Sequence, residues 1–90
     1  MKYQVDWEQA ALEELASLWL KANGSVRESV TVATHRIDIE LSSDPIEKSE
    51  SRSEGTRVAF VAPLGMTFQL SGDGKAVQIL HVWIFRRGQR

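Results

Sequence analysis

Apolar and polar residues alternate at the start of the chain and then adopt a helical spacing. Tyr3, Val5 and Trp7 alternate with polar residues, which predicts a short half-buried strand. Between residues 8 and 22, apolar residues recur every three or four positions, as they do on one face of a helix. These positions are Ala11, Leu15, Leu18 and Ala22, and Leu12 and Trp19 widen the apolar stripe.

Residues that cap helices suggest where two helices begin and end. Asp6, with Gln9 three residues later, is the expected N-cap of the first helix. Asn23-Gly24 is expected to end that helix, because both residues tolerate the left-handed cap conformation. Ser25, with Glu28 three residues later, is the expected N-cap of a second helix.

Residues 25–43 continue the helical spacing, but they also contain features of a strand. Their periodic apolar positions are Val26, Val30, Ala33, Ile37 and Leu41. Parts of the segment alternate, and its β-branched residues favour strands. We predict a helix, because an uninterrupted run of about 17 residues is long for a strand. Asp44-Pro45 is expected to end it, since a residue that precedes proline avoids the helical region.

The second half of the chain has the pattern of a β-meander. Residues 47–55 are polar and predict an exposed loop. Ser71-Gly72-Asp73-Gly74 is a strong hairpin signal, because glycines supply the positive φ that tight turns need. Pro63-Leu64-Gly65 predicts a further turn or bulge. The strands expected between these turns span residues 57–62, 66–70 and 76–85.

The last predicted strand is apolar on both faces. Strict alternation puts Val77, Ile79, His81, Trp83 and Phe85 on one face and Gln78, Leu80, Val82 and Ile84 on the other. Such a strand is typical of the centre of a sheet. Two helices of this length cover only one face of a small sheet. The second face is therefore a candidate partner surface.

Together these elements predict an α+β fold in a single domain that spans residues 1–90. We expect a strand, two helices and then a three-stranded antiparallel meander, with the helices packed on one face of the sheet. The chain has no cysteine, which excludes disulfides and thiolate metal sites. No cofactor or metal ion is expected, because two distant histidines do not make a zinc site.

Charge is distributed unevenly along the chain. The net charge of −1 combines −5 in residues 1–50, with five Lys or Arg against ten Asp or Glu, and +4 in residues 51–90, with six against two. A basic half of this kind suits an anionic partner such as nucleic acid or an acidic peptide. Acidic residues interrupt the N-terminal segment, so it does not have the pattern of a signal peptide. No apolar run is long enough to span a membrane, and we expect a cytoplasmic protein.

Few residues are candidates for acid–base chemistry. His81 lies in the last predicted strand among aromatic residues, where a structural role and proton transfer both remain open. His35 is expected on the surface of the second helix. Arginine stabilises phosphate charge but is a poor proton carrier, because its pKa exceeds 12.

In the order and spacing of these elements the chain resembles the RelE/ParE superfamily of type II toxin–antitoxin toxins, often labelled plasmid stabilisation proteins. The resemblance spans nearly the whole chain, although no one of its motifs is specific. The matching segments are Tyr3-Gln4-Val5-Asp6-Trp7, Ala10-Ala11-Leu12-x-x-Leu15, Ile37-x-x-x-Leu41-x-x-x-Pro45, Arg57, Pro63-Leu64-Gly65-Met66 and Val82-Trp83-Ile84-Phe85-Arg86-Arg87.

The resemblance implies a toxin that is neutralised by a cognate antitoxin. Some members of the family cut messenger RNA on the ribosome, and others act on DNA gyrase. By position, Arg57 is similar to the arginine of the second strand, and Arg87 or Arg86 to the one that follows the last strand. The lysines usual on the sheet of the RNA-cutting members are not evident, and no tyrosine or histidine follows Arg87 in the printed sequence.

Our main hypothesis is therefore a toxin-like protein that binds an antitoxin on the second face of the sheet or in a groove beside the helices. The alternatives are a ribosome-dependent endoribonuclease and a non-toxic homodimer. The predicted partner contacts are Leu80, Val82, Trp83, Ile84 and Arg86. If the chain is a nuclease, Arg57 and Arg87 are expected to bind phosphate and His81 to transfer protons.

Overall fold

The computed structural model describes residues 2–47, 49–52 and 54–85. Within them the elements are β1 (Gln4–Trp7), α1 (Gln9–Lys21), α2 (Gly24–Ser43), β2 (Glu50–Ser51), β3 (Thr56–Val61), β4 (Leu64–Leu70) and β5 (Ala76–Ile84). The predicted α+β order is confirmed, and the segment 25–43 is helical. The segment expected to be a loop contains one short additional strand, β2.

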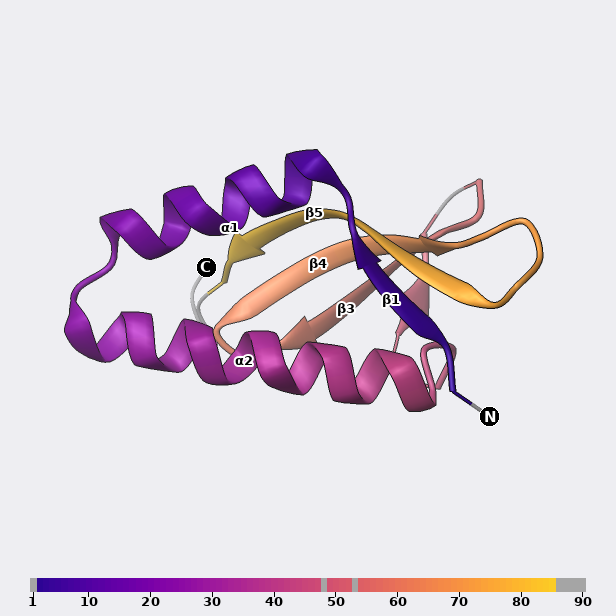
Figure 1. The fold of residues 1–90 in the computed structure, drawn as a ribbon, viewed down its shortest axis with the longest axis horizontal. Helices are drawn as coiled ribbons and strands as arrows, with labels where there is room; N and C mark the ends of the chain where they lie inside the picture. Colours follow the sequence, from indigo (N-terminus) through magenta and orange to yellow (C-terminus); the bar gives the residue numbers. More distant parts are fainter. Residues whose placement is uncertain (1, 48, 53, 86–90) are drawn as a thin grey trace.

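The strands of the described residues form one sheet in the order β1-β5-β4-β3-β2. β3, β4 and β5 make the expected antiparallel meander. β1 lies parallel to β5, with Gln4 opposite Ala76 and Trp7 opposite Ile79. β1 therefore pairs with only the first half of β5. Beyond Ile79, α1 runs along the strand instead (Figure 1).

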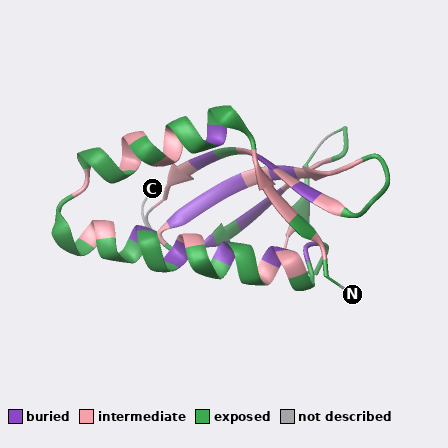
Figure 2. Ribbon diagram, in the orientation of Figure 1, coloured by how far each residue is buried: buried purple, intermediate pink, exposed green. Residues whose placement is uncertain are grey.

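Both helices pack on one face of the sheet, as predicted (Figure 1). Burial follows this arrangement, because the helices are buried on the sides turned to the sheet and exposed elsewhere (Figure 2). Burying these apolar side chains is the main force that stabilises the fold. The core cluster comprises Ala11, Val30, Ala33, Ile37, Leu41, Ala59, Val61, Leu64, Met66, Phe68, Val77, Ile79 and Val82.

The helix caps differ from the sequence prediction. Asp6 lies within β1, and Glu8 occupies the N-cap position of α1. Asn23 does not end α1 in a left-handed conformation; its φ is −81°, and its side chain accepts a hydrogen bond of 3.0 Å from the backbone N–H of Val26. Asn23 is thus the N-cap of α2, in place of Ser25. The physical reason is that the link between the helices is only two residues long: Ala22 is the C-cap of α1, which leaves Asn23 as the residue that caps the free N–H groups of α2.

The alternation expected along the last strand is wrong after Ile79. In the pairing of β4 with β5, Phe68 lies opposite Ile79 and the preceding Thr67 lies opposite His81, so Leu80 is an extra residue in a β-bulge. The bulge reverses the alternation, and Val82 faces the core together with Val77 and Ile79. The second face of β5 consequently has His81 and Trp83 in place of Val82 and Ile84.

Candidate functional site

An apolar pocket of about 500 Å³ lies between the two helices. We call it the interhelical groove. It is lined by Leu12, Leu15, Ala16, Trp19 and Leu20 of α1 and by Val30, Thr31, Thr34 and His35 of α2. Val30 also belongs to the core, so the groove reaches down to the packed interior.

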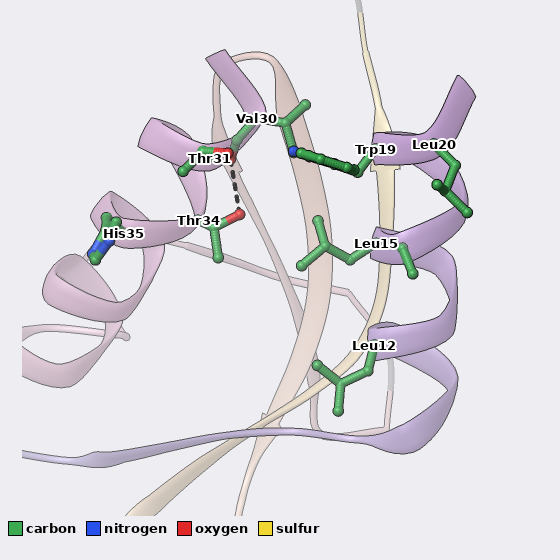
Figure 3. A pocket seen from close by; sticks show the side chains of 9 residues that line it. Leu12, Leu15, Trp19, Leu20, Val30, Thr31, Thr34 and His35 are labelled. Atoms are coloured by element: carbon green, nitrogen blue, oxygen red, sulfur yellow. Dashed lines mark hydrogen bonds between the residues drawn. The ribbon is translucent and has the colours of Figure 1, made fainter. Parts of the chain in front are cut away.

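Side chains of the two helices point toward each other across this groove. Leu12, Leu15 and Trp19 extend from α1 toward α2 (Figure 3). On the opposite wall, the Thr34 hydroxyl donates to the Val30 carbonyl oxygen at 2.8 Å, which satisfies its hydrogen bonding within the helix. Large apolar side chains remain open to solvent here: Leu12 is 45% exposed, Trp19 41% and Leu20 68%. Clustered exposure of this kind marks an interaction surface more often than scattered apolar residues do.

Arg27 of α2 binds the C-terminal end of α1 at the end of the groove where the two helices are joined. Its Nε donates to the Trp19 carbonyl oxygen at 2.9 Å, and its terminal nitrogen donates to the Leu20 carbonyl oxygen at 3.2 Å. These are carbonyls of the last turn of α1, where the regular helical hydrogen bonds end; the Trp19 oxygen also accepts from the backbone N–H of Ala22 at 3.3 Å. The guanidinium also lies over the Trp19 ring, 4.5 Å from its centroid. Arg27 therefore ties the two helices together and holds the Trp19 ring in place.

A separate, polar site lies beside β5, just beyond Ile79, where the pairing of β5 with β1 ends. The Glu14 carboxylate accepts a hydrogen bond of 3.0 Å from the backbone N–H of Val82, and it lies 3.2 Å from Nδ1 of His81. Because an ionised carboxylate only accepts, Nδ1 is the donor in this contact. The Val82 N–H holds the pKa of Glu14 below its ordinary value, and the contact with His81 adds to this effect, while partial burial opposes it.

Replacing Glu14 with glutamine should lower stability in a pH-dependent way. The pKa of Glu14 is lowered in the folded state, so its charge stabilises the fold above its ordinary pKa of 4.5, and this contribution is lost as the pH falls through the folded pKa. The site is partly solvated, so we expect a loss of about 0.5–1 kcal/mol near pH 7. Urea unfolding of both proteins at pH 7 and pH 3 measures it; a difference that is the same at both values would contradict the assignment.

Arg57 is engaged in structural hydrogen bonds with the segment that follows α2. Its guanidinium donates to the Ser49 hydroxyl at 2.7 Å and to the carbonyl oxygens of Ser49 and Ile46 at 3.2 and 3.3 Å. Arg57 pairs with Phe68, in the row that faces the core, whereas His81 pairs with Thr67 in the next row. Successive rows face opposite sides of a sheet, so the structure does not bring Arg57 and His81 together. Arg87 lies outside the described residues.

The predicted partner contacts on the last strand have different surroundings. Val82 is buried in the core, and Ile84 packs against it. Leu80 and Trp83 are half-buried. The Trp83 ring meets Phe60 edge-on, with centroids 6.4 Å apart. Arg86 lies outside the described residues. Contact with a partner therefore remains a prediction that suits Leu80 and Trp83 better than Val82.

Two features of the surface were missed from sequence. Phe60 is 51% exposed, although a strand phenylalanine is commonly expected in the core. Leu20 was not recognised as part of an apolar wall. The available signal was the width of the stripe on α1, because Leu12, Trp19 and Leu20 extend it beyond the positions needed to cover the sheet.

Two kinds of site are not found in the part of the chain that the structure describes. None of its helices has the length and apolar character needed to cross a membrane. Nor does any group of three or more His, Asp or Glu side chains there come close enough to hold a metal ion.

Comparisons with known proteins identify the fold. No protein-family model matches the sequence, and no curated protein matches it. Among solved structures, the chain is similar to the toxin–antitoxin complex RelBE2 of Mycobacterium tuberculosis, with a TM-score of 0.71, 20% identity and coverage of 94% of this chain and 100% of the other.

Two further structures agree with this match. The chromosomal ParDE system of P. aeruginosa gives a TM-score of 0.73 and 16% identity, and covers 94% of this chain and 98% of the other. The isolated E. coli RelE toxin gives a TM-score of 0.59 and 21% identity, and covers 97% of this chain and 88% of the other. The chain therefore has the RelE/ParE fold.

Proposed function

Because this chain has the RelE/ParE fold, we propose that it is the toxin-like component of a type II toxin–antitoxin module. We propose further that it binds its cognate antitoxin by accepting an amphipathic helix in the interhelical groove. The observation that carries the second proposal is the groove itself, whose apolar walls include the exposed side chains of Leu12, Trp19 and Leu20.

The dimensions of the groove suit a helical ligand. α1 forms one wall and has 13 residues, which corresponds to a length of about 20 Å. A helix of similar length can place its apolar stripe between α1 and α2, a common mode of peptide recognition. Support also comes from the similar RelBE2 and ParDE structures, which are toxin–antitoxin systems.

Co-expression with the product of the adjacent reading frame tests this proposal. We expect growth arrest when the chain is produced alone, rescue when both proteins are produced, and a stable complex on size-exclusion chromatography. Sedimentation of the chain alone provides the comparison with the homodimer alternative. A dimer that buries the groove, together with no arrest and no complex, would contradict the proposal.

A second candidate function, RNA cleavage on the ribosome, is favoured by the Glu14–His81 contact. Glu14 holds Nδ1 of His81, which leaves Nε2 as the nitrogen for proton transfer. A carboxylate that orients an imidazole in this way is a recurrent arrangement in acid–base catalysis. In such a reaction Nε2 would accept the proton of the RNA 2′-hydroxyl as the 2′-oxygen attacks the adjacent phosphorus. The displaced 5′-oxygen would take up a proton from water, which leaves a 2′,3′-cyclic phosphate and a 5′-hydroxyl. DNA gyrase remains an alternative target.

Cleavage of ribosome-bound messenger RNA by purified protein tests this second candidate. General acid–base catalysis contributes about 10²–10⁴-fold to rates, so His81→Ala should reduce the cleavage rate by at least about 100-fold. Thr67→Ala, which changes the neighbour of His81 on β4, is the matched control and should cleave normally. Equal rates for the wild-type and His81→Ala proteins would exclude this role.

A further inference from the structure

The interhelical groove has charges of opposite sign at its two ends. At the end where the helices are joined, Arg27 lies over Trp19. At the other end, Glu8 and Asp38 lie about one helical turn beyond the lining residues Leu12 and His35. Asp38 accepts a hydrogen bond of 3.1 Å from Nε1 of Trp7, the residue before Glu8. Both Glu8 and Asp38 are exposed. Between the two ends, the lining contains apolar residues, two threonines and His35.

The carboxylates at the open end have capacity for a partner. Asp38 uses Oδ1 to bind Trp7. Glu8 occupies the N-cap position of α1, but within the described residues its side chain makes no capping hydrogen bond. A carboxylate has about four acceptor sites, so both groups can accept from a cation that enters the groove.

Helix dipoles do not cancel this pattern. The N-terminus of α1 contributes roughly half a positive charge near Glu8, against two full negative charges from Glu8 and Asp38. At the joined end, the C-terminus of α1 and the N-terminus of α2 contribute roughly equal and opposite halves. Lys21 in the last turn of α1 and Glu28 in α2 also balance each other there. Arg27 therefore sets the sign at the joined end.

We infer that the helix accepted by this groove has a basic residue in one terminal turn, which meets Glu8 and Asp38, and none in the turn that meets Arg27. The inference rests on the proposed function, because it specifies the chemistry of the partner at the same groove. The apolar stripe of that helix would supply affinity, while its charged ends would supply discrimination between partners.

Selection from a displayed peptide library tests the inference. The probe is a library of 13-residue helices with a fixed apolar stripe and random Lys or Glu in the first and last turns. Binders are selected on the wild-type protein and counter-selected on Trp19→Ala, so that only binders that depend on the groove remain. We expect the selected peptides to have Lys at one end and Glu at the other, and peptides with Glu at both ends to be depleted.

The matched control is the protein with Glu8→Lys and Asp38→Lys, which should select peptides with Glu at both ends. The double variant Glu8→Gln, Asp38→Asn should bind a peptide selected on the wild-type protein roughly three- to thirtyfold more weakly at low salt. If peptides bind through Trp19 but their end charges are random, the inference fails and the proposed function stands. If no peptide depends on Trp19, both fail.

Discussion

Replacing Trp19 with alanine should weaken antitoxin binding by about 2–3 kcal/mol, or roughly 30- to 150-fold in Kd. Trp19 is the largest side chain in the groove wall, and Arg27 holds its ring in place before a partner arrives. A preorganised aromatic anchor of this kind is typical of binding hot spots. Isothermal titration of the purified chain with its antitoxin measures the change.

Phe60→Ala is the matched control for this substitution. Phe60 is an aromatic residue with similar exposure, 51% against 41%, but it lies on β3 and does not line the interhelical groove. We expect the Phe60→Ala protein to bind the antitoxin as the wild type does. The groove assignment would be contradicted if Phe60→Ala abolished binding while Trp19→Ala left it unchanged.

Replacing Val82 with aspartate should destabilise the protein by about 3–5 kcal/mol, the cost of an unpaired buried charge. Val82 is 4% exposed and lies in the core cluster. Total stability of a domain is only about 5–15 kcal/mol, so the variant should lose a large part of its stability. Chemical or thermal unfolding followed by circular dichroism measures the loss.

The comparison with Trp83→Asp tests the bulge directly. Trp83 follows Val82 but is half-buried on the opposite face, beside Phe60, so its replacement should cost about 1–2 kcal/mol. Strict alternation from Val77 would reverse this order, because it places Trp83 in the core and Val82 on the open face. A larger loss of stability for Trp83→Asp than for Val82→Asp would contradict the β-bulge at Leu80.

The patterns that succeeded at the sequence level are local ones. The helical spacing through Val30, Ala33, Ile37 and Leu41 identified the buried face of α2, and all four are buried. The glycines and aspartate after Leu70 located the hairpin, where Gly74 has a φ of +71°. These features follow from the preferences of short segments, which do not depend on the rest of the fold.

Features that depend on distant segments could not be predicted in this way. The bulge at Leu80 is defined by the pairing of β5 with β4, which the spacing within β5 does not reveal. Arg57 looked available for phosphate, but its hydrogen bonds go to Ser49 and Ile46, in the segment that follows α2. The groove arises from the separation of two helices, and neither helix alone shows that their outer stripes face each other.

The most direct test of helix binding in the interhelical groove is mapping of backbone amide chemical shifts as antitoxin is added to the labelled chain. Binding in the groove predicts that the largest changes fall on residues 12–20 and 27–35, with small changes at Thr67 and Gln69 on the far side of the sheet. Large changes centred on Phe60, Thr67 and Trp83, with residues 12–20 unaffected, would contradict it.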